Sequence, residues 1–139
     1  MLRLTGEGDM QAYLWIGIGS ALGGMARHWC NGVIMRMAGA GFPYGILTIN
    51  VLGSFVIGIA SAVMVGEGRW PSSPTAQQFV LVGLCGGYTT FSSFSLNTLN
   101  LIQGSQWGLA AANILLSVAL CLFAVWAGHA AGVALNPAG

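Results

Sequence analysis

Uncharged polar side chains recur within the apolar stretches of this sequence. They are hydroxyls and carboxamides, namely Asn50, Ser54, Thr89, Thr90, Ser92, Ser93, Ser95, Asn97, Asn113 and Ser117. Such groups donate hydrogen bonds without a full charge, which suits a small anion that must bind and then leave, whereas rings of carboxylates favour cations. Hydrogen bonding between neighbouring helices is the alternative role for each of them. The pattern indicates either a polar track for an anion or interhelical bonding.

Two phenylalanines and one arginine accompany this polar series. Phe91 and Phe94 are three residues apart and therefore share one helix face. Either their positive ring edges face an anion, or the rings pack on a neighbouring helix. Arg27 is the only charge well inside an apolar stretch. Either its guanidinium extends to the membrane surface, or its field concentrates anions at a water-filled vestibule.

The sequence contains no set of residues typical of an enzyme. Its apolar stretches hold no Asp or Glu, and no phosphate-binding glycine loop is present. Cys30, Cys85 and Cys121 are isolated, without metal-site spacing, and are interpreted as reduced thiols. We therefore expect a protein that is not an enzyme.

The composition is that of a membrane protein. Hydrophobic residues make up 55% of the chain and charged residues only 5%, whereas soluble domains have about 25% charged residues. No formal charge occurs from Trp70 to Gly139, so this half cannot present a water-facing surface. The formal net charge of +1 comes without a basic run, so nucleic acid is not an expected partner.

Four charge-poor apolar stretches are each long enough to cross a bilayer as a helix. They cover approximately residues 11–33, 44–65, 75–102 and 107–135. The connectors are too short for a second domain, so residues 1–139 are predicted to form a single membrane domain. Because Arg3 is outweighed by Glu7 and Asp9, the first stretch lacks the positive flank of a signal peptide and is kept as a helix. The expected fold is an all-α integral membrane protein with four transmembrane helices.

Glycine spacing predicts close helix packing and one broken helix. Gly19 and Gly23, Ser54 and Gly58, and Gly83 and Gly87 are each four apart, which is the spacing of small residues at membrane helix interfaces. Residues 83–95 instead combine adjacent glycines with two threonines, which favour a helix interior poorly. We expect the third helix to be broken at mid-membrane, where backbone carbonyls become available to an ion.

Arginine counting predicts dual topology. With four spans, Arg3 and Arg69 lie on one side of the membrane, and Arg36, with Arg27 nearby, lies on the other. Orientation follows the Lys/Arg bias, and here the two sides differ by at most one residue. Such a chain should insert both ways and form an antiparallel dual-topology homodimer.

Three motifs resemble the Fluc/CrcB family of fluoride channels. They are GGMAR at 23–27, PYGILTINVLG at 43–53 and, most specific, GGYTTFSSFS at 86–95. The resemblance covers roughly residues 17–132. It implies a fluoride-selective passive channel in the cell inner (plasma) membrane, which exports fluoride and so reduces its cytoplasmic toxicity. It also implies that two pores form between the subunits of an antiparallel homodimer.

The resemblance also implies roles for individual residues. Phe91 and Phe94 resemble the phenylalanines that border the fluoride positions, and Arg27 the arginine near the vestibule. The fluoride pathway would further contain Asn50, Ser92, Ser93 and Ser117. The backbone carbonyls of Gly86 and Thr89 from both subunits would hold a structural sodium ion at the dimer two-fold axis.

The chain departs from the family pattern at four positions. Asn97 stands where a glutamate is usual, Asn113 where some members have a pore tyrosine, Cys121 where some have serine, and Ile46 where many have threonine. These changes bear on conduction rate more than on the identity of the ion.

Two other classes of protein share parts of the pattern. A small multidrug-type dual-topology transporter has a similar length, but it needs a membrane carboxylate to couple protons, and the first helix has none. A non-transporting packing or accessory subunit would need only the small-residue pairs and polar patches. The accessory-subunit alternative predicts no ion flux from the purified protein.

Overall fold

The computed structural model describes residues 7–65 and 72–136, and every regular element within them is helical. Three helices are long and unbroken, and the chain between α2 and α6 forms a series of shorter helical segments. The elements are α1 (Glu7–Ala38), α2 (Tyr44–Val65), α3 (Pro74–Gln77), the π-helical segment η1 (Gln78–Cys85), α4 (Gly86–Tyr88), α5 (Phe91–Gln103) and α6 (Trp107–Leu135).

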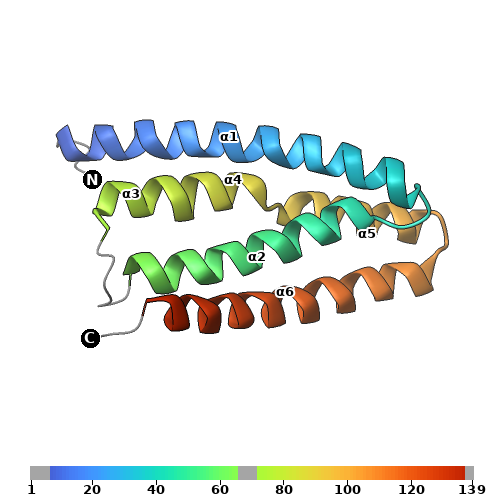
Figure 1. The fold of residues 1–139 in the computed structure, drawn as a ribbon. Coiled ribbons are helices and arrows are strands. Elements are labelled where there is room, and N and C mark those ends of the chain that lie inside the picture. The colour runs from blue at the N-terminus through green and yellow to red at the C-terminus, as the bar shows by residue number, and fades with distance from the viewer. Residues whose placement is uncertain (1–6, 66–71, 137–139) are drawn as a thin grey trace, which may run out of the picture.

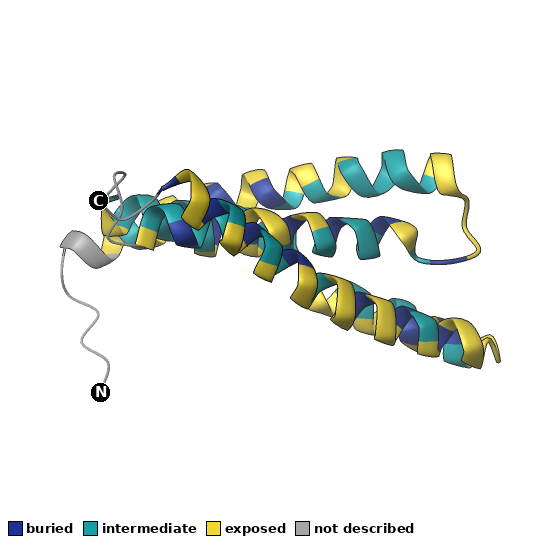
Figure 2. Ribbon diagram, turned by 60° about the horizontal axis from the view of Figure 1, so that its bottom comes forward, coloured by how far each residue is buried: buried dark blue, intermediate teal, exposed yellow. Residues whose placement is uncertain are grey.

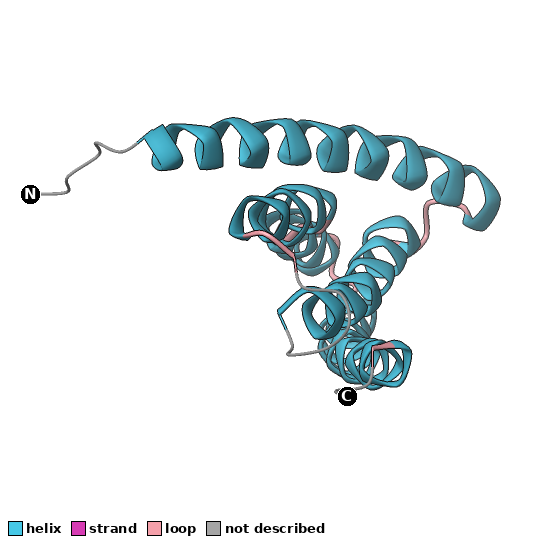
Figure 3. Ribbon diagram, turned by 60° about the vertical axis from the view of Figure 1, so that its left-hand side comes forward, coloured by secondary structure: helices cyan, strands magenta, loops and turns pink. Residues whose placement is uncertain are grey.

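The helical segments lie side by side and alternate in direction (Figure 1). α1 begins and α6 ends at one end of the bundle, and the connectors 39–43 and 104–106 lie at the other. α1 ends where Gly39 takes a positive φ of 82° and donates its N–H to the Met35 carbonyl at 3.0 Å, a conformation that glycine adopts without steric cost. Figure 3 shows that α1 runs across the remaining helices.

Backbone contact between glycines joins α1 to the third helical segment. A methyl group at Gly23 would overlap the Leu84 carbonyl, and one at Gly87 would lie 2.6 Å from the Ser20 carbonyl. The Cβ position of Gly83 lies 3.0 Å from the Gly19 Cα. The two glycine pairs predicted to pack therefore pack against each other.

A second glycine contact joins α2 to α6. Methyl groups at Gly58 and Gly128 would overlap the carbonyls of Val125 and Phe55, and one at Gly132 would lie 2.8 Å from the Ile59 carbonyl. Gly58 was one of the predicted packing residues. The other predicted member of its pair, Ser54, instead lines a cavity.

Few large side chains are buried within the single chain. Ile49 and Asn113 are the two largest that are fully buried among the described residues. Large apolar side chains such as Trp29, Leu115 and Phe123 are instead exposed, and exposed positions run along the outside of every helix (Figure 2). This distribution suits a protein whose surroundings are lipid rather than water.

Among the described residues, three helical segments are long and apolar enough to cross a membrane, namely Tyr44–Val65, Pro74–Gln103 and Trp107–Leu135. They match the expected stretches 44–65, 75–102 and 107–135. α1 covers the expected stretch 11–33 and extends beyond it at both ends, but glycines and polar residues make it less apolar. The fourth span therefore stays a prediction.

Candidate functional site

The third helical segment is interrupted by two residues with extended backbone. Thr89 has φ −83° and ψ 159°, and Thr90 has φ −155° and ψ 113°. The irregular conformation was expected across 83–95, with Gly86 and Gly87 contributing, but these glycines are helical in α4. Thr90 then begins α5 as its N-cap, since its Oγ1 accepts the Ser93 N–H at 3.2 Å.

Asn50 on α2 binds both backbone polar groups of Thr90. Its Nδ2 donates to the Thr90 carbonyl at 3.0 Å, and its Oδ1 accepts the Thr90 N–H at 2.8 Å. A carboxamide can make this paired contact because it carries one donor and one acceptor side by side. Asn50 therefore satisfies the Thr90 N–H, which the interruption would otherwise leave unpaired, and adds a second donor to the Thr90 carbonyl, which as the N-cap carbonyl also accepts the first bond of α5.

Arg27 on α1 also contacts the interruption. Its Nη1 donates to the Thr89 carbonyl at 3.1 Å, and the side chain is half-buried. It lines neither of the cavities described below. Sequence reasoning placed this charge at the membrane surface or in a vestibule and did not find the contact with Thr89.

Four carbonyl oxygens lose their helical donors at the interruption, those of Gly86, Gly87, Tyr88 and Thr89. In a continuous helix, the N–H of Thr90 would bond to the Gly86 carbonyl and that of Ser93 to the Thr89 carbonyl. Thr90 instead donates to Asn50, and Ser93 donates to the Thr90 hydroxyl. The Gly86 and Thr89 carbonyls are thus two of the four that the break leaves without a helical donor, and the Thr89 carbonyl accepts a bond from Arg27 instead.

A cavity of about 370 Å³ lies beside the interruption, between α2, α5 and α6. It is lined by Asn50, Ser54, Ile57, Thr89, Thr90, Phe91, Phe94, Ser117, Val118, Cys121 and Leu122. We call it the inner cavity. No residue in this lining carries a formal charge, and its polar groups are a carboxamide and hydroxyls. Four residues of the predicted fluoride pathway therefore meet here, namely Asn50, Phe91, Phe94 and Ser117.

The two phenylalanines form one aromatic wall of the inner cavity. Their ring centroids are 5.2 Å apart and the ring planes are inclined at 48°. Phe91 is 77% exposed, so within this chain it does not pack in a core. Its ring is available to an ion or to another copy of the chain.

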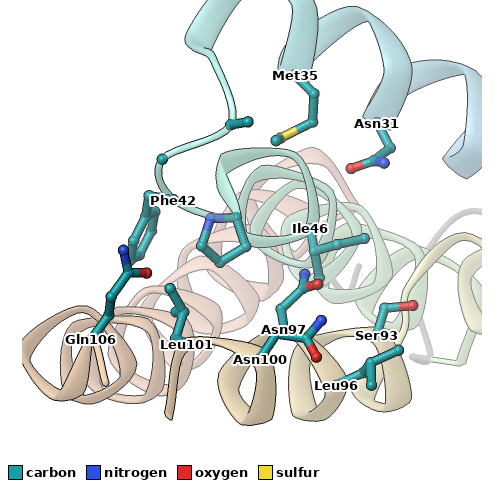
Figure 4. A pocket seen from close by; sticks show the side chains of 13 residues that line it. Asn31, Met35, Phe42, Ile46, Ser93, Leu96, Asn97, Asn100, Leu101 and Gln106 are labelled. Atoms are coloured by element: carbon teal, nitrogen blue, oxygen red, sulfur yellow. The ribbon is translucent and has the colours of Figure 1, made fainter. Parts of the chain in front are cut away.

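A second cavity, of about 510 Å³, lies toward the end of the bundle formed by the connectors 39–43 and 104–106. We call it the outer cavity (Figure 4). Its carboxamides are those of Asn31, Asn97, Asn100 and Gln106, and only Asn97 of these was singled out from the sequence. Asn31 comes from α1, and its side chain fits where Gly45 has no side chain. Ile46, which like Asn97 departs from the family pattern, also lines the outer cavity.

Hydroxyl groups connect the two cavities. Thr90 lines the inner cavity and Ser93 the outer one, and the Thr90 Oγ1 donates to the Ser93 Oγ at 3.1 Å. Ser92 lies 3.1 Å from the same hydroxyl but lines neither cavity. Polar groups thus continue from one cavity to the other.

An uncharged polar cavity beside an interrupted helix is typical of membrane channels and transporters. A family profile described as "CrcB-like protein, Camphor Resistance (CrcB)" matches residues 14–129. The chain belongs to this family.

Three curated relatives match along nearly their whole length. One from Methylocella silvestris is 53% identical over 89% of this chain and 95% of its own length. Relatives from Opitutus terrae and Rhodospirillum rubrum are 47% and 48% identical, over 91% and 89% of this chain and 96% of their own lengths in both cases. All three relatives are named fluoride-specific ion channel FluC.

Proposed function

We propose that this chain forms a passive, fluoride-selective channel. The observation that supports this most directly is the inner cavity, in which Asn50, the threonine and serine hydroxyls and the Phe91–Phe94 pair surround about 370 Å³ without any formal charge. The names of the relatives point to the same ion. A channel is not an enzyme, and the proposal needs no catalytic residue.

The chemistry of this cavity favours a small anion that passes through. Hydroxyl and amide donors replace part of the hydration shell, and ring edges add weak positive potential. The absence of a fixed positive charge in the lining keeps binding weak enough for release. Acidic residues occur in this sequence only at Glu7, Asp9 and Glu67, so a proton-coupled transporter would lack the membrane carboxylate that it needs.

A second copy of the chain would complete the pore. The inner cavity is open on one side, and Phe91 and Leu122 in its lining are exposed. We propose an antiparallel, dual-topology homodimer in which each cavity is closed by the partner. The arginine balance supports this, although Arg3 and Arg69 lie outside the described residues. It requires that α1 crosses the membrane as a fourth span and that the break at Thr89–Thr90 lies at mid-membrane.

The carbonyls freed at the break suit a structural sodium ion. Neutral oxygens are the ligands that hard cations take, and the Gly86 and Thr89 carbonyls have lost their helical donors. As the family resemblance implies, the ion would lie on the two-fold axis and take this pair of oxygens from each of the two chains. Its role would be to hold the two breaks together.

Fluoride efflux from liposomes tests the proposed function. Purified protein would be reconstituted, external fluoride measured with an electrode, and a potassium ionophore added to release the charge. We expect fluoride efflux without ATP or a proton gradient, and no comparable efflux of chloride, which is too large for close contact with the donors. Absence of fluoride efflux would support the accessory-subunit alternative, and equal chloride efflux would refute selectivity. In bacterial cells, the channel would act in the inner membrane and export fluoride.

Topology is tested independently of flux. A cysteine introduced at the carboxyl terminus, in a background lacking Cys30, Cys85 and Cys121, would be labelled with an impermeant reagent from each side of intact cells. We expect labelling from both sides. Labelling from one side only would refute the antiparallel dimer.

A further inference from the structure

A buried chain of hydrogen bonds links α6 to α5 beside the inner cavity. The Asn113 Nδ2 donates to the Thr98 Oγ1 at 2.9 Å, and the Thr98 hydroxyl donates to the Phe94 carbonyl at 2.9 Å. At the other end, the Ser117 Oγ lies 3.5 Å from the Asn113 Oδ1. Asn113 is 2% exposed and Thr98 is 8% exposed, so these groups have little access to water.

The Phe94 carbonyl, at the α5 end of this series of hydrogen bonds, determines the direction of every bond in the series. The Phe94 carbonyl can only accept, so the Thr98 hydroxyl must donate to it and must accept from Asn113. This orients the Asn113 carboxamide, whose Oδ1 then points toward the Ser117 hydroxyl. A single orientation of all four groups satisfies the chain, as is typical of buried polar networks that define one packing arrangement.

These hydrogen bonds attach α5 directly to α6 within the protomer. Of the thirteen residues of α5, only Thr98 and Leu101 are buried. Glycine contacts of the kind that hold α1 and α2 do not occur along α5, which contains no glycine. The Asn113–Thr98 bond therefore fixes the distance between α5 and α6 at a place where apolar packing contributes little.

The two residues at the ends of this hydrogen-bond series line the inner cavity, whereas the two residues in its middle do not. Phe94 and Ser117 belong to the lining, and Asn113 and Thr98 lie behind it. We propose that Asn113 and Thr98 are positioning residues that hold the Phe94 wall and the Ser117 wall of the inner cavity at a fixed separation. The effect that we expect on fluoride efflux rests on the proposed function. The positioning of the two cavity walls does not.

Paired substitutions distinguish positioning from simple stabilisation. Thr98→Val removes the hydroxyl with little change of shape, and Thr98→Ser retains it. We expect Thr98→Val to lower fluoride efflux about tenfold, as loss of a buried polar contact would, and Thr98→Ser to stay within about twofold of the wild type. Both proteins should elute as the same oligomer on gel filtration.

The double variant Thr98→Val with Asn113→Leu sharpens the test. Removing both partners leaves no unpaired amide, and such replacements can be nearly neutral for stability. If the pair only stabilises the fold, efflux should return to the wild-type rate, which would overturn the proposal. If the pair sets the separation of the walls, efflux should stay low and chloride should be excluded less well.

Thiol labelling gives a readout that does not depend on fluoride. Cys121 lines the inner cavity, so its rate of reaction with a small methanethiosulfonate reagent reports how open the walls are. In a Cys30→Ala, Cys85→Ala background, we expect Thr98→Val to raise this rate severalfold and Thr98→Ser to leave it unchanged. Unchanged labelling in Thr98→Val would overturn the proposal. If the wild type shows no efflux but Thr98→Val still alters the labelling rate, the proposed function is refuted and the positioning role is retained.

Discussion

The two halves of the third helical segment meet the rest of the protein in different ways. Before Thr89, the segment contacts α1 backbone to backbone through Gly83 and Gly87. After Thr90, α5 has two buried residues and is held by hydrogen bonds from Asn50 and Asn113. The comparison shows a closely packed half that supports the fold and a polar half whose exposed face is available to an ion or a second chain.

The largest expected effect comes from disturbing the packed half. Gly23→Ala places a methyl group against the Leu84 carbonyl and the Tyr88 backbone nitrogen, and such overpacking typically costs about 1–3 kcal/mol or more. Gly24→Ala is the matched control, because nothing lies within 4 Å of its added methyl. We expect Gly23→Ala to lose most of the folded oligomer on gel filtration and to melt at a lower temperature. Equal stability of the two variants would contradict the packing described for this half.

The next effect concerns the junction between the halves. Asn50→Leu leaves the Thr90 N–H without a partner, at about 1–3 kcal/mol for a buried group, and removes the side-chain donor to the Thr90 carbonyl. We expect fluoride efflux to fall about a hundredfold, whereas Thr48→Val on the same helix should conduct normally. Asn50→Asp should also impair efflux, because an ionised carboxylate repels the anion. Normal efflux in Asn50→Leu would mean that the break holds its shape without this contact.

Substitutions in the polar half should affect conduction without affecting assembly. Phe91→Ile and Phe94→Ile retain apolar bulk but remove the polarised ring edges. We expect each to lower fluoride efflux about tenfold with the oligomer intact, which corresponds to about 1.4 kcal/mol in the barrier. Phe123→Ile, at an exposed position on α6, serves as the control. If both cavity variants conduct normally, the rings only pack.

The smallest effect is expected in the outer cavity. Asn97→Glu adds a carboxyl group to a half-buried position. Glutamate is ionised well above its ordinary pKa of about 4.3, so its charge should lower fluoride efflux about twofold near neutral pH. Efflux should recover as the pH falls toward that pKa, after subtraction of the leak through protein-free liposomes. The wild type should show no such recovery, and a flat profile in the variant would place Asn97 away from the ion path.

Much of the packed half could be predicted from sequence, and less of the polar half. The four-residue spacing of Gly19 and Gly23 indicates a close interface directly, because only small residues permit it. The position of the break does not follow from glycine content, since Gly86 and Gly87 are unfavourable in helices but remain helical here. The extended residues are Thr89 and Thr90, and Asn50, forty residues earlier, accepts the Thr90 N–H that has lost its helical acceptor. Contacts such as Arg27 to Thr89 and Asn113 to Thr98 depend on how whole helices are rotated and placed, which residue spacing does not specify.

The interruption at Thr89–Thr90 also redistributes charge. A helix carries a partial positive charge at its first residues and a partial negative charge at its last ones, each about half an elementary charge. A continuous helix over Pro74–Gln103 would hold these poles at its two distant ends, whereas the break brings one of each kind to the inner cavity. Arg27 compensates the negative pole through its bond to the Thr89 carbonyl. The positive pole, at Thr90 and Phe91, meets no acidic side chain in the cavity lining, so the backbone dipoles there favour an anion.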